Sequence, residues 1–253
     1  MSKIIIANWK MYLSHEQALS VSKALVVFSK RVSADKKIVI CPSYISFKDV
    51  VDIFRDSRVS IGAQDIFWEE RGAYTGEISA LDIKMLGGEY VLLGHSERRK
   101  NFNETNKMIH DKTRICLENG LIPVLCIGED WEQKKNGQRD YVLIQQLNEV
   151  LEGISVSDSN KIIIAYEPVW AISAGGGVHA SPEEVNYVQK VIRQVLLDLY
   201  DNFIINDVFK IIYGGSVTPE NVKEYTDIQN ISGVLVGGAS VNADTFNKLI
   251  GAT

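Results

Sequence analysis

One carboxylate in this chain stands where a general base would be expected. Glu167 follows the apolar run Lys161–Tyr166, and Pro168 comes directly after it. The segment beyond contains Trp170 and Ile172. Because Pro168 ends strand pairing and apolar residues follow, the chain can fold over Glu167 and exclude water. A carboxylate removed from water becomes a usable base near neutral pH. An isolated glutamate at a strand end is more often a solvated turn residue, so this interpretation depends on its polar neighbours.

Other polar side chains with chemical potential follow other apolar runs. Asn8 and Lys10 close the first run, and His95 and Glu97 follow the fourth. Lys10 sits between Trp9 and Met11, which is an unusual position for a fully solvated lysine. His95 taken alone fits an ordinary hydrogen-bonded histidine at the end of a strand. Each residue is a weak signal by itself, and together they predict one polar cluster.

Glycines follow the last two apolar runs. Gly214, Gly215 and Ser216 come after the seventh, and Gly237 and Gly238 close the eighth. Both sets could be plain tight turns. Consecutive glycines also leave backbone N–H groups bare enough to surround a phosphate, and Ser216 adds a hydroxyl. Such donors would let a chain of net charge −5 bind an anion without many arginines.

The elements that must position these residues are short strands alternating with longer helical patterns. The apolar character of the runs is nearly continuous, as in parallel strands covered by helices. The eight predicted strands are Lys3–Trp9, Lys37–Cys41, Arg58–Ala63, Glu89–Gly94, Leu121–Gly128, Lys161–Tyr166, Phe209–Tyr213 and Gly233–Gly237.

Helix starts are marked by capping residues. Ser14–Gln17 and Ser181–Glu184 have the spacing of capping boxes. Thr218, followed by Pro219 and Glu220, predicts a third start. Gly120 is expected to end a helix that begins at about Glu104.

The spacing of the strands favours one domain over two. Successive strands begin roughly every thirty residues, with no linker rich in Pro and Ser between them. We therefore predict a single α/β domain over residues 1–253, a (β/α)8 barrel in which the strand ends carrying the polar residues meet at one face. A doubly wound open sheet is the alternative fold, but Asn8–Met11 lacks the glycine fingerprint of a dinucleotide site.

Composition narrows the function classes. The chain has 253 residues, of which 45% are hydrophobic, and its net charge of −5 disfavours a nucleic-acid-binding surface. Cys41, Cys116 and Cys126 form no CxxC pair and the four histidines are scattered, so we expect reduced thiols and no metal site. We also expect no membrane segment, no secretory signal in Met1–Lys10 and a location in the cytosol.

Seven short motifs, spread in order along the chain, are a more specific signal than the separate residues above. They are Asn8–Lys10, Gly72–Glu77, Gly94–Arg99, Cys126–Glu129, Ala165–Ala171, Tyr213–Val217 and Leu235–Ser240. On these motifs the chain resembles the triosephosphate isomerase family over essentially its whole length, which implies a TIM barrel.

The resemblance implies a reaction and a set of roles. The expected reaction interconverts dihydroxyacetone phosphate and D-glyceraldehyde 3-phosphate through an enediol(ate), a step of glycolysis and gluconeogenesis that needs no cofactor. Glu167 would move a carbon-bound proton, and His95 would polarise the carbonyl as a neutral imidazole. Lys10 would face the phosphate and the oxyanion, Asn8 would bind the substrate oxygen, and Glu97 would order Lys10.

The resemblance also implies a phosphate site, a lid and a dimer. The expected phosphate contacts include Asn8, Lys10, Ser173, Ser216, Gly237 and Gly238. The expected lid comprises Pro168, Val169, Trp170, Ala171, Ile172, Ser173 and Ala174. Thr75 matches the residue that reaches into a neighbouring subunit, which implies a homodimer.

The lid is where the chain departs from the family pattern. Ser173 and Ala174 replace the usual Gly and Thr, and we expect Gly175–Gly177 to act as a hinge that compensates. Two alternatives to an isomerase stay open: another phosphate-binding barrel enzyme, such as an epimerase, and a catalytically impaired homologue that only binds a partner. The first does not explain Asn8, Lys10, His95 and Glu167 together.

Overall fold

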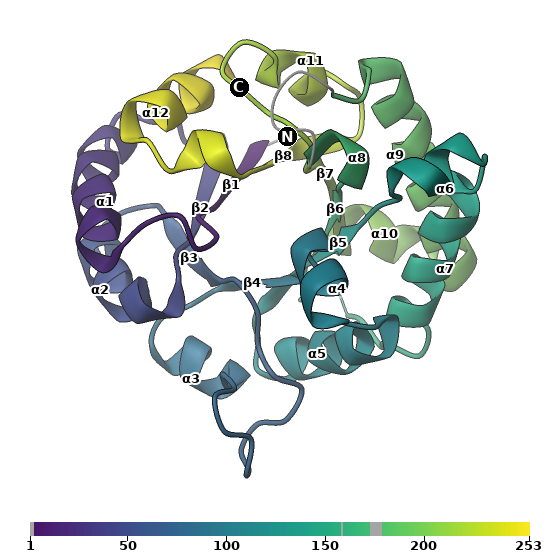
Figure 1. The fold of residues 1–253 in the computed structure, drawn as a ribbon, viewed down its shortest axis with the longest axis horizontal. Helices are drawn as coiled ribbons and strands as arrows, with labels where there is room; N and C mark the ends of the chain where they lie inside the picture. The colour runs from purple at the N-terminus through teal and green to yellow at the C-terminus, as the bar shows by residue number, and fades with distance from the viewer. Residues whose placement is uncertain (1–2, 158, 173–178) are drawn as a thin grey trace.

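The chain forms a closed barrel of eight parallel strands, each paired with its neighbours in sequence order (Figure 1). The computed structural model describes residues 3–157, 159–172 and 179–253. Strand β1 pairs with β2 on one side and with β8 on the other, which closes the ring. The strands are β1 Lys3–Asn8, β2 Lys36–Cys41, β3 Ser60–Ala63, β4 Tyr90–Leu93, β5 Ile122–Ile127, β6 Ile162–Tyr166, β7 Phe209–Tyr213 and β8 Ile231–Val236.

Helices surround the ring of strands (Figure 1). They are α1 His15–Ser29, α2 Tyr44–Phe54, α3 Ala80–Met85, α4 Ser96–Phe102, α5 Asn106–Glu118, α6 Trp131–Lys135, α7 Arg139–Leu151, α8 Val169–Ile172, α9 Pro182–Leu199, α10 Asn202–Val208, α11 Val222–Thr226 and α12 Ala243–Ala252, with one 3₁₀ turn, η1, at Gly238–Ser240. No helix in the described ranges is both long and apolar enough to cross a bilayer.

All eight predicted strands are confirmed, with ends that differ by up to two residues. Strand β8 begins two residues before the predicted Gly233. Gly233 lies inside the strand. The residue there must be glycine, because a Cβ would stand 1.8 Å from the carbonyl oxygen of Ile4. This glycine therefore allows β1 and β8 to approach and does not mark a strand end.

Two of the three predicted helix starts are confirmed. Ser14 and Ser181 each form a full capping box at the start of α1 and α9. The start at Thr218 is wrong, because α11 begins at Val222. Thr218 belongs instead to a turn closed by Asn221, whose Oδ1 accepts a hydrogen bond from the Thr218 N–H at 2.8 Å.

The helix expected between Glu104 and Gly120 is α5. Thr105 caps its N-terminus by accepting a hydrogen bond from the Met108 N–H, so Glu104 lies just before the helix. Gly120 adopts a φ of 63° after the helix end, which is the left-handed conformation expected of a C-terminal glycine.

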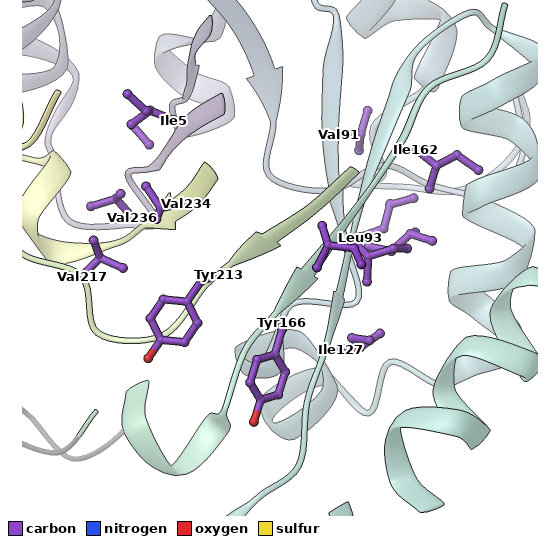
Figure 2. Packing of buried hydrophobic residues seen from close by; sticks show 14 of the residues in the cluster. Ile5, Val91, Leu93, Ile127, Ile162, Tyr166, Tyr213, Val217, Val234 and Val236 are labelled. Carbon is purple, nitrogen blue, oxygen red and sulfur yellow. The ribbon is translucent and has the colours of Figure 1, made fainter. Parts of the chain in front are cut away.

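The core has two layers. The inner layer contains only strand residues and fills the barrel: Ile6, Val39, Cys41, Tyr90, Leu92, Val124, Cys126, Ile163, Ala165, Ile212 and Leu235. The outer layer joins alternate strand residues to the helices, and Figure 2 shows part of it, including Tyr166 and Tyr213 on neighbouring strands. At Gly62 a Cβ would lie 2.8 Å from the Cys41 sulfur, so β3 contributes space to the inner layer.

Strand alternation determines which residues face the mouth of the barrel. On β6, Ala165 belongs to the inner layer and Tyr166 to the outer layer. Because side chains alternate along a strand, Glu167 returns to the inner side. Asn8 does the same on β1, after the outward Ala7. Both residues stand at the carboxyl ends of their strands, where the interior opens.

The three cysteines are buried free thiols, as predicted. Cys41 and Cys126 lie in the inner layer, and Cys116 lies on α5. Burial raises the pKa of each thiol above its usual value, so the thiols stay protonated at neutral pH.

Candidate active site

The carboxyl ends of the strands surround a pocket of about 280 Å³. It gathers residues from five of the predicted positions, although they lie far apart in the sequence. Its lining residues are Asn8, Lys10, Tyr12, His95, Glu167, Ile172, Gly214, Gly215, Ser216, Val217, Thr218, Leu235, Gly237, Gly238 and Ala239. The structure therefore brings the predicted Asn8, Lys10, His95, Glu167, Ser216, Gly237 and Gly238 together in one cavity.

Lys10 is held by its backbone and by its side chain. Its φ of 50° is left-handed, and its N–H donates a 3.0 Å hydrogen bond to Asn8 Oδ1. At the other end, Lys10 Nζ donates to Glu97 Oε1 at 2.6 Å. Glu97 thus orders Lys10, as expected, and it does so from outside the pocket lining.

Gln64 is a supporting residue that the sequence interpretation missed. Its Nε2 donates to the carbonyl oxygens of Lys10, at 2.8 Å, and Cys41, at 3.0 Å. These bonds stabilise the left-handed turn after β1. Gln64 directly follows β3, so its place at a strand end was the one available signal.

His95 is oriented by the start of α4. Its Nδ1 accepts a 3.2 Å hydrogen bond from the Glu97 N–H. A ring nitrogen that accepts a hydrogen bond carries no proton, so in this arrangement the imidazole is neutral with its hydrogen on Nε2. That Nε2 lies 3.1 Å from Glu167 Oε1. His95 can therefore present an N–H to the interior of the pocket.

Glu167 is almost completely buried, at 2% exposure. Its Oε2 accepts a 3.1 Å hydrogen bond from the Ser96 N–H, while its Oε1 faces His95. The carboxylate is thus directed by two neighbouring residues of one segment. Glu167 is thus buried in this arrangement, as its apolar surroundings in the sequence predict.

Two glycines make room for Glu167. A Cβ on Gly128 would stand 1.7 Å from the Glu167 carbonyl oxygen. A Cβ on Gly214 would stand 3.0 Å from Glu167 Cγ. The glycine after β5 and the glycine after β7 therefore allow the strands on either side of β6 to close around the carboxylate. Gly214 therefore makes space for the Glu167 side chain.

The glycine loops after β7 and β8 expose backbone donors. Within the described ranges, the N–H groups of Ser216, Gly237 and Gly238 have no protein acceptor. Gly238 opens η1, whose turn is closed by a 2.9 Å bond from the Ser240 N–H to the Gly237 carbonyl. Asn221 fixes the other loop by donating to the Ser216 carbonyl at 3.1 Å. Free donors on two facing loops form a suitable anion site.

Glu129 holds the segment that follows Glu167. It is fully buried and accepts hydrogen bonds from the Tyr166 hydroxyl, at 3.2 Å, and from Trp170 Nε1, at 2.8 Å. Burial raises the pKa of Glu129, and the bonds from Trp170 and Tyr166 act in the opposite direction. The carboxylate fixes α8 relative to β5 and β6. Glu129 ends the motif Cys126–Glu129, and the sequence pattern alone does not predict this role.

Several predicted residues lie outside this geometry. Ser173, Ala174 and Gly175–Gly177 fall outside the described residues, so only Pro168 to Ile172 of the expected lid is seen. Of these five, Ile172 lines the pocket and Trp170 is bound to Glu129. Thr75 is exposed on the loop between β3 and α3, away from the pocket lining.

Comparison with known proteins gives one consistent result. The family model described as triosephosphate isomerase matches residues 3–253. The chain is 43% identical over 248 residues to a triosephosphate isomerase of Dictyoglomus thermophilum, with 98% of each chain covered. A triosephosphate isomerase of Thermoanaerobacter sp. is 40% identical over 247 residues, again with 98% of each covered. The chain belongs to the triosephosphate isomerase family.

Membership in the triosephosphate isomerase family defines the reaction. The protein is an aldose–ketose isomerase that interconverts dihydroxyacetone phosphate and D-glyceraldehyde 3-phosphate, a reaction of glycolysis. Its substrate is a phosphorylated triose. Neither the epimerase-like alternative nor the binding-protein alternative gains support from these relatives.

Proposed function

We propose that the 280 Å³ pocket is the site of isomerisation and that Glu167 carries the proton. The observation that supports this most is the pairing of Glu167 and His95, 3.1 Å apart and both buried. One is a carboxylate shielded from water, and the other is a neutral donor. These are the two groups that proton abstraction next to a carbonyl requires.

The proposed reaction moves one proton from C1 to C2 through Glu167 and one proton between the two oxygens through His95. Glu167 removes a proton from C1 of dihydroxyacetone phosphate, and the electron pair moves into the C1–C2 bond as the carbonyl becomes an enediolate oxygen. His95 gives its Nε2 proton to that oxygen on C2 and takes the hydroxyl proton from the oxygen on C1, so the enediolate charge moves to the C1 oxygen. Glu167 then returns a proton to C2 as the C1 oxygen becomes the aldehyde carbonyl. No atom is gained or lost in the sequence.

Two residues at and just beyond the end of β1, Asn8 and Lys10, supply a hydrogen-bonding amide and a positive charge for the substrate. Lys10 places a cation at the mouth of the pocket, where it can stabilise the oxyanion and attract the phosphate. The bond to Glu97 weakens the positive potential of Lys10, because the two charges have opposite signs, but it holds the ammonium group in place. Asn8 lies 4% exposed beside it, and its side-chain amide can bind the substrate oxygen.

The phosphate is proposed to bind the loops after β7 and β8. Its donors are the N–H groups of Ser216, Gly237 and Gly238, together with the Ser216 hydroxyl and Lys10. Ser173 is a further proposed contact, from the segment outside the described residues. The proposed lid spans Pro168 to Ala174.

The observed Glu167 is in a resting position. One oxygen is bound by the Ser96 N–H and the other faces His95 Nε2. A substrate oxygen that binds His95 must displace this carboxylate oxygen, since the same ring nitrogen serves both. Substrate entry and movement of Glu167 toward the pocket are therefore coupled in this proposal.

The proposal extends to the state of the whole protein. It works in the cytosol as a homodimer in which Thr75 contacts the partner, and residues 1–253 act as one domain. It binds neither nucleic acid nor membrane and uses no metal or cofactor. The net charge of −5 supports the absence of a nucleic-acid-binding surface, and the exposed loop bearing Thr75 supports the dimer contact.

A coupled assay that consumes D-glyceraldehyde 3-phosphate tests the residue roles. Glu167→Gln keeps the size of the side chain but removes the base, so turnover should fall on the order of 10²–10⁴-fold. His95→Gln should also lose turnover. The exposed Glu224→Gln on α11 is the matched control and should behave as wild type. Normal turnover by folded Glu167→Gln would exclude Glu167 as the base.

A further inference from the structure

A second hollow lies beside the start of α4 and shares no lining residue with the active-site pocket. Its volume is about 540 Å³, compared with about 280 Å³ for the active site, and small-molecule sites usually have volumes of about 300–1,000 Å³. We call it the tryptophan pocket. Its lining residues are Ser96, Arg99, Lys100, Gly128, Asp130, Trp131, Glu132, Gln133, Gln146, Val169 and Trp170.

Two tryptophans give this pocket its chemical character. Trp131 begins α6 and is 56% exposed, which is a large aromatic surface to leave in water. Its ring lies edge-on to Trp170, with 6.2 Å between centroids and 61° between planes. Trp170 is fixed by its bond to Glu129 and by Lys134, whose Nζ lies 3.5 Å from the ring centroid. A planar ring packed against this edge-on pair would gain aromatic contact.

Most of the polar groups in the walls are already satisfied. Asp130 and Gln133 form a capping box with each other. Gln146 accepts from the Gly128 N–H and donates to the Gly128 carbonyl. Arg99 is also held, by bonds that include its Nε donating to the Gly94 carbonyl at 2.8 Å. Because these groups already have hydrogen-bond partners in the protein, a ligand would bind mainly through apolar and aromatic contacts.

Two charges at the rim are available for the edge of a ligand. Within the described ranges, neither Lys100 nor Glu132 has a side-chain partner. They carry opposite signs, so the pocket selects no net charge by itself. The chemistry shared by all ligands that suit it is therefore a flat aromatic ring of about the size of an indole.

The pocket touches the groups that hold Glu167. Ser96 lines it, and the Ser96 N–H binds Glu167 Oε2. Val169 and Trp170 also line it, and they belong to α8, two and three residues after Glu167. A ligand in contact with both walls would fix the spacing between α4 and α8 in the arrangement observed. That arrangement is the one in which Glu167 rests against Ser96.

We propose that the tryptophan pocket binds a small planar aromatic molecule and that its occupancy holds Glu167 at rest, which slows isomerisation. This inference rests on the proposed role of Glu167. It makes the pocket an inhibitory site separate from the phosphate and the reacting carbons. An active-site ligand that displaces Glu167 from Ser96 should lower the affinity of the protein for the aromatic ligand. By linkage, the aromatic ligand lowers the affinity for the active-site ligand by the same factor.

Binding is tested first, by a measurement independent of activity. Protein labelled with ¹⁵N in its four tryptophans, Trp9, Trp68, Trp131 and Trp170, is titrated with indole, and the Nε1–H signals are followed by NMR. The signals of Trp131 and Trp170 should shift together with one dissociation constant. Those of Trp9 and Trp68 should stay in place. Signals that do not move, or that all move without saturation, would overturn the proposal.

Substitutions locate the ligand. Trp131→Ala should weaken indole at least about tenfold without changing basal turnover, and Trp131→Phe should restore part of the affinity. Tyr141→Ala removes another exposed aromatic, on α7 outside the pocket, and is the matched control. Equal affinity in Trp131→Ala and wild type would contradict the assignment.

The effect on the reaction is tested with the same probe. Indole should lower turnover of the wild type, and Trp131→Ala should resist it. Saturation with 2-phosphoglycolate, a phosphorylated carboxylate that mimics the enediolate, should weaken indole about fivefold or more. Binding of indole with no effect on turnover and no effect of 2-phosphoglycolate would overturn the inhibitory role. Since the NMR titration needs no catalysis, an inactive wild type would instead indicate a failure of the proposed function.

Discussion

Glu167 and His95 are each directed by a backbone N–H of the same segment. Ser96 donates to Glu167 Oε2, and the next residue, Glu97, donates to His95 Nδ1. One turn of chain thus sets the position of the base and the tautomer of the electrophile. A protonated imidazole would lose the second bond, because Nδ1 could no longer accept it. The neutral state required by the mechanism is therefore the state that the local backbone supports.

Shortening the base should separate catalysis from binding. Glu167→Asp withdraws the carboxylate by one methylene, and a displacement of this size can cost about 10²-fold in rate. We expect turnover to fall by that order or more with little change in KM, because Glu167 acts on the transition state. Steady-state kinetics measure both constants. Unchanged turnover would mean that another group takes the proton.

Blocking the phosphate loop should have the opposite effect on the two constants. In Gly237→Val the side chain would stand next to Lys10, whose Cε is 3.4 Å from the position of the added Cβ. The bulk obstructs close approach of the dianion, so KM should rise and inhibition by phosphate analogues should weaken. Gly251→Val, in open space on α12, is the control for folding. Unaltered inhibition by these analogues would place the anion elsewhere.

At the scale of elements, a cluster of four charges, three of them buried, joins α4, α5 and the segment after β3. Lys112 donates to Asp65 Oδ1 at 2.8 Å and also to Glu104. Arg98 lies 2.7 Å from Asp65. Glu104 Oε2 has no partner among the described residues. Since α4 carries the residues that direct Glu167 and His95, this cluster anchors the catalytic segment to the barrel.

The cluster should make stability depend on pH in a defined direction. Burial raises the pKa of Asp65 from 3.8 to about 6, with Lys112 and Arg98 acting in the opposite direction. A raised folded pKa means that the contribution of Asp65 to stability is complete below about 3.8 and lost as the pH rises through about 6. Between these values, the free energy of unfolding of the wild type should fall relative to Asp65→Asn, on the order of 3 kcal/mol.

Urea unfolding from pH 4 to 7 at one protein concentration measures this difference. Fixed concentration matters because an oligomer's stability depends on it. Asp56→Asn, an exposed carboxylate on the surface, should change nothing across the range. A difference between wild type and Asp65→Asn that stays constant, or that grows with pH, would contradict the assignment.

The strands could be predicted from the sequence because apolar runs report burial directly. The charge cluster could not, because Asp65, Arg98, Glu104 and Lys112 share no motif and meet only through the fold. Thr218 shows a different limit, since a capping residue before proline suits a turn as well as a helix. Local signals cannot decide between the two when the decisive partner, here Asn221, is itself ambiguous.

At the scale of the whole molecule, closure of the barrel is what assembles the site. Five residues at the carboxyl ends of five different strands meet only because β1 pairs with β8: Asn8, His95, Glu167, Ser216 and Gly237. This convergence could be predicted from the order of strands and the polar residues at their ends. The supporting bonds of Gln64 and Ser96 could not, because they depend on distances across the barrel mouth.

The proposed homodimer gives a prediction at the same scale. The loop between β3 and α3 projects from the ring of helices, and it carries Thr75 and the half-exposed Tyr74 (Figure 1). Light scattering should give twice the chain mass of 28.3 kDa. Thr75→Arg places a charge in the proposed contact and should shift the mass toward one chain, with reduced turnover. A wild type of single-chain mass would remove the proposed dimer.

The central claim is that Glu167 moves a proton between adjacent carbons. The most direct measurement converts dihydroxyacetone phosphate in D₂O, traps the product and determines by NMR the hydrogen isotope at C2. We predict deuterium at C2 in the wild type, because a carboxylate proton exchanges with solvent, and a rate at least about 10²-fold lower in Glu167→Gln. A product with only protium at C2, formed at the same rate by both proteins, would contradict the account.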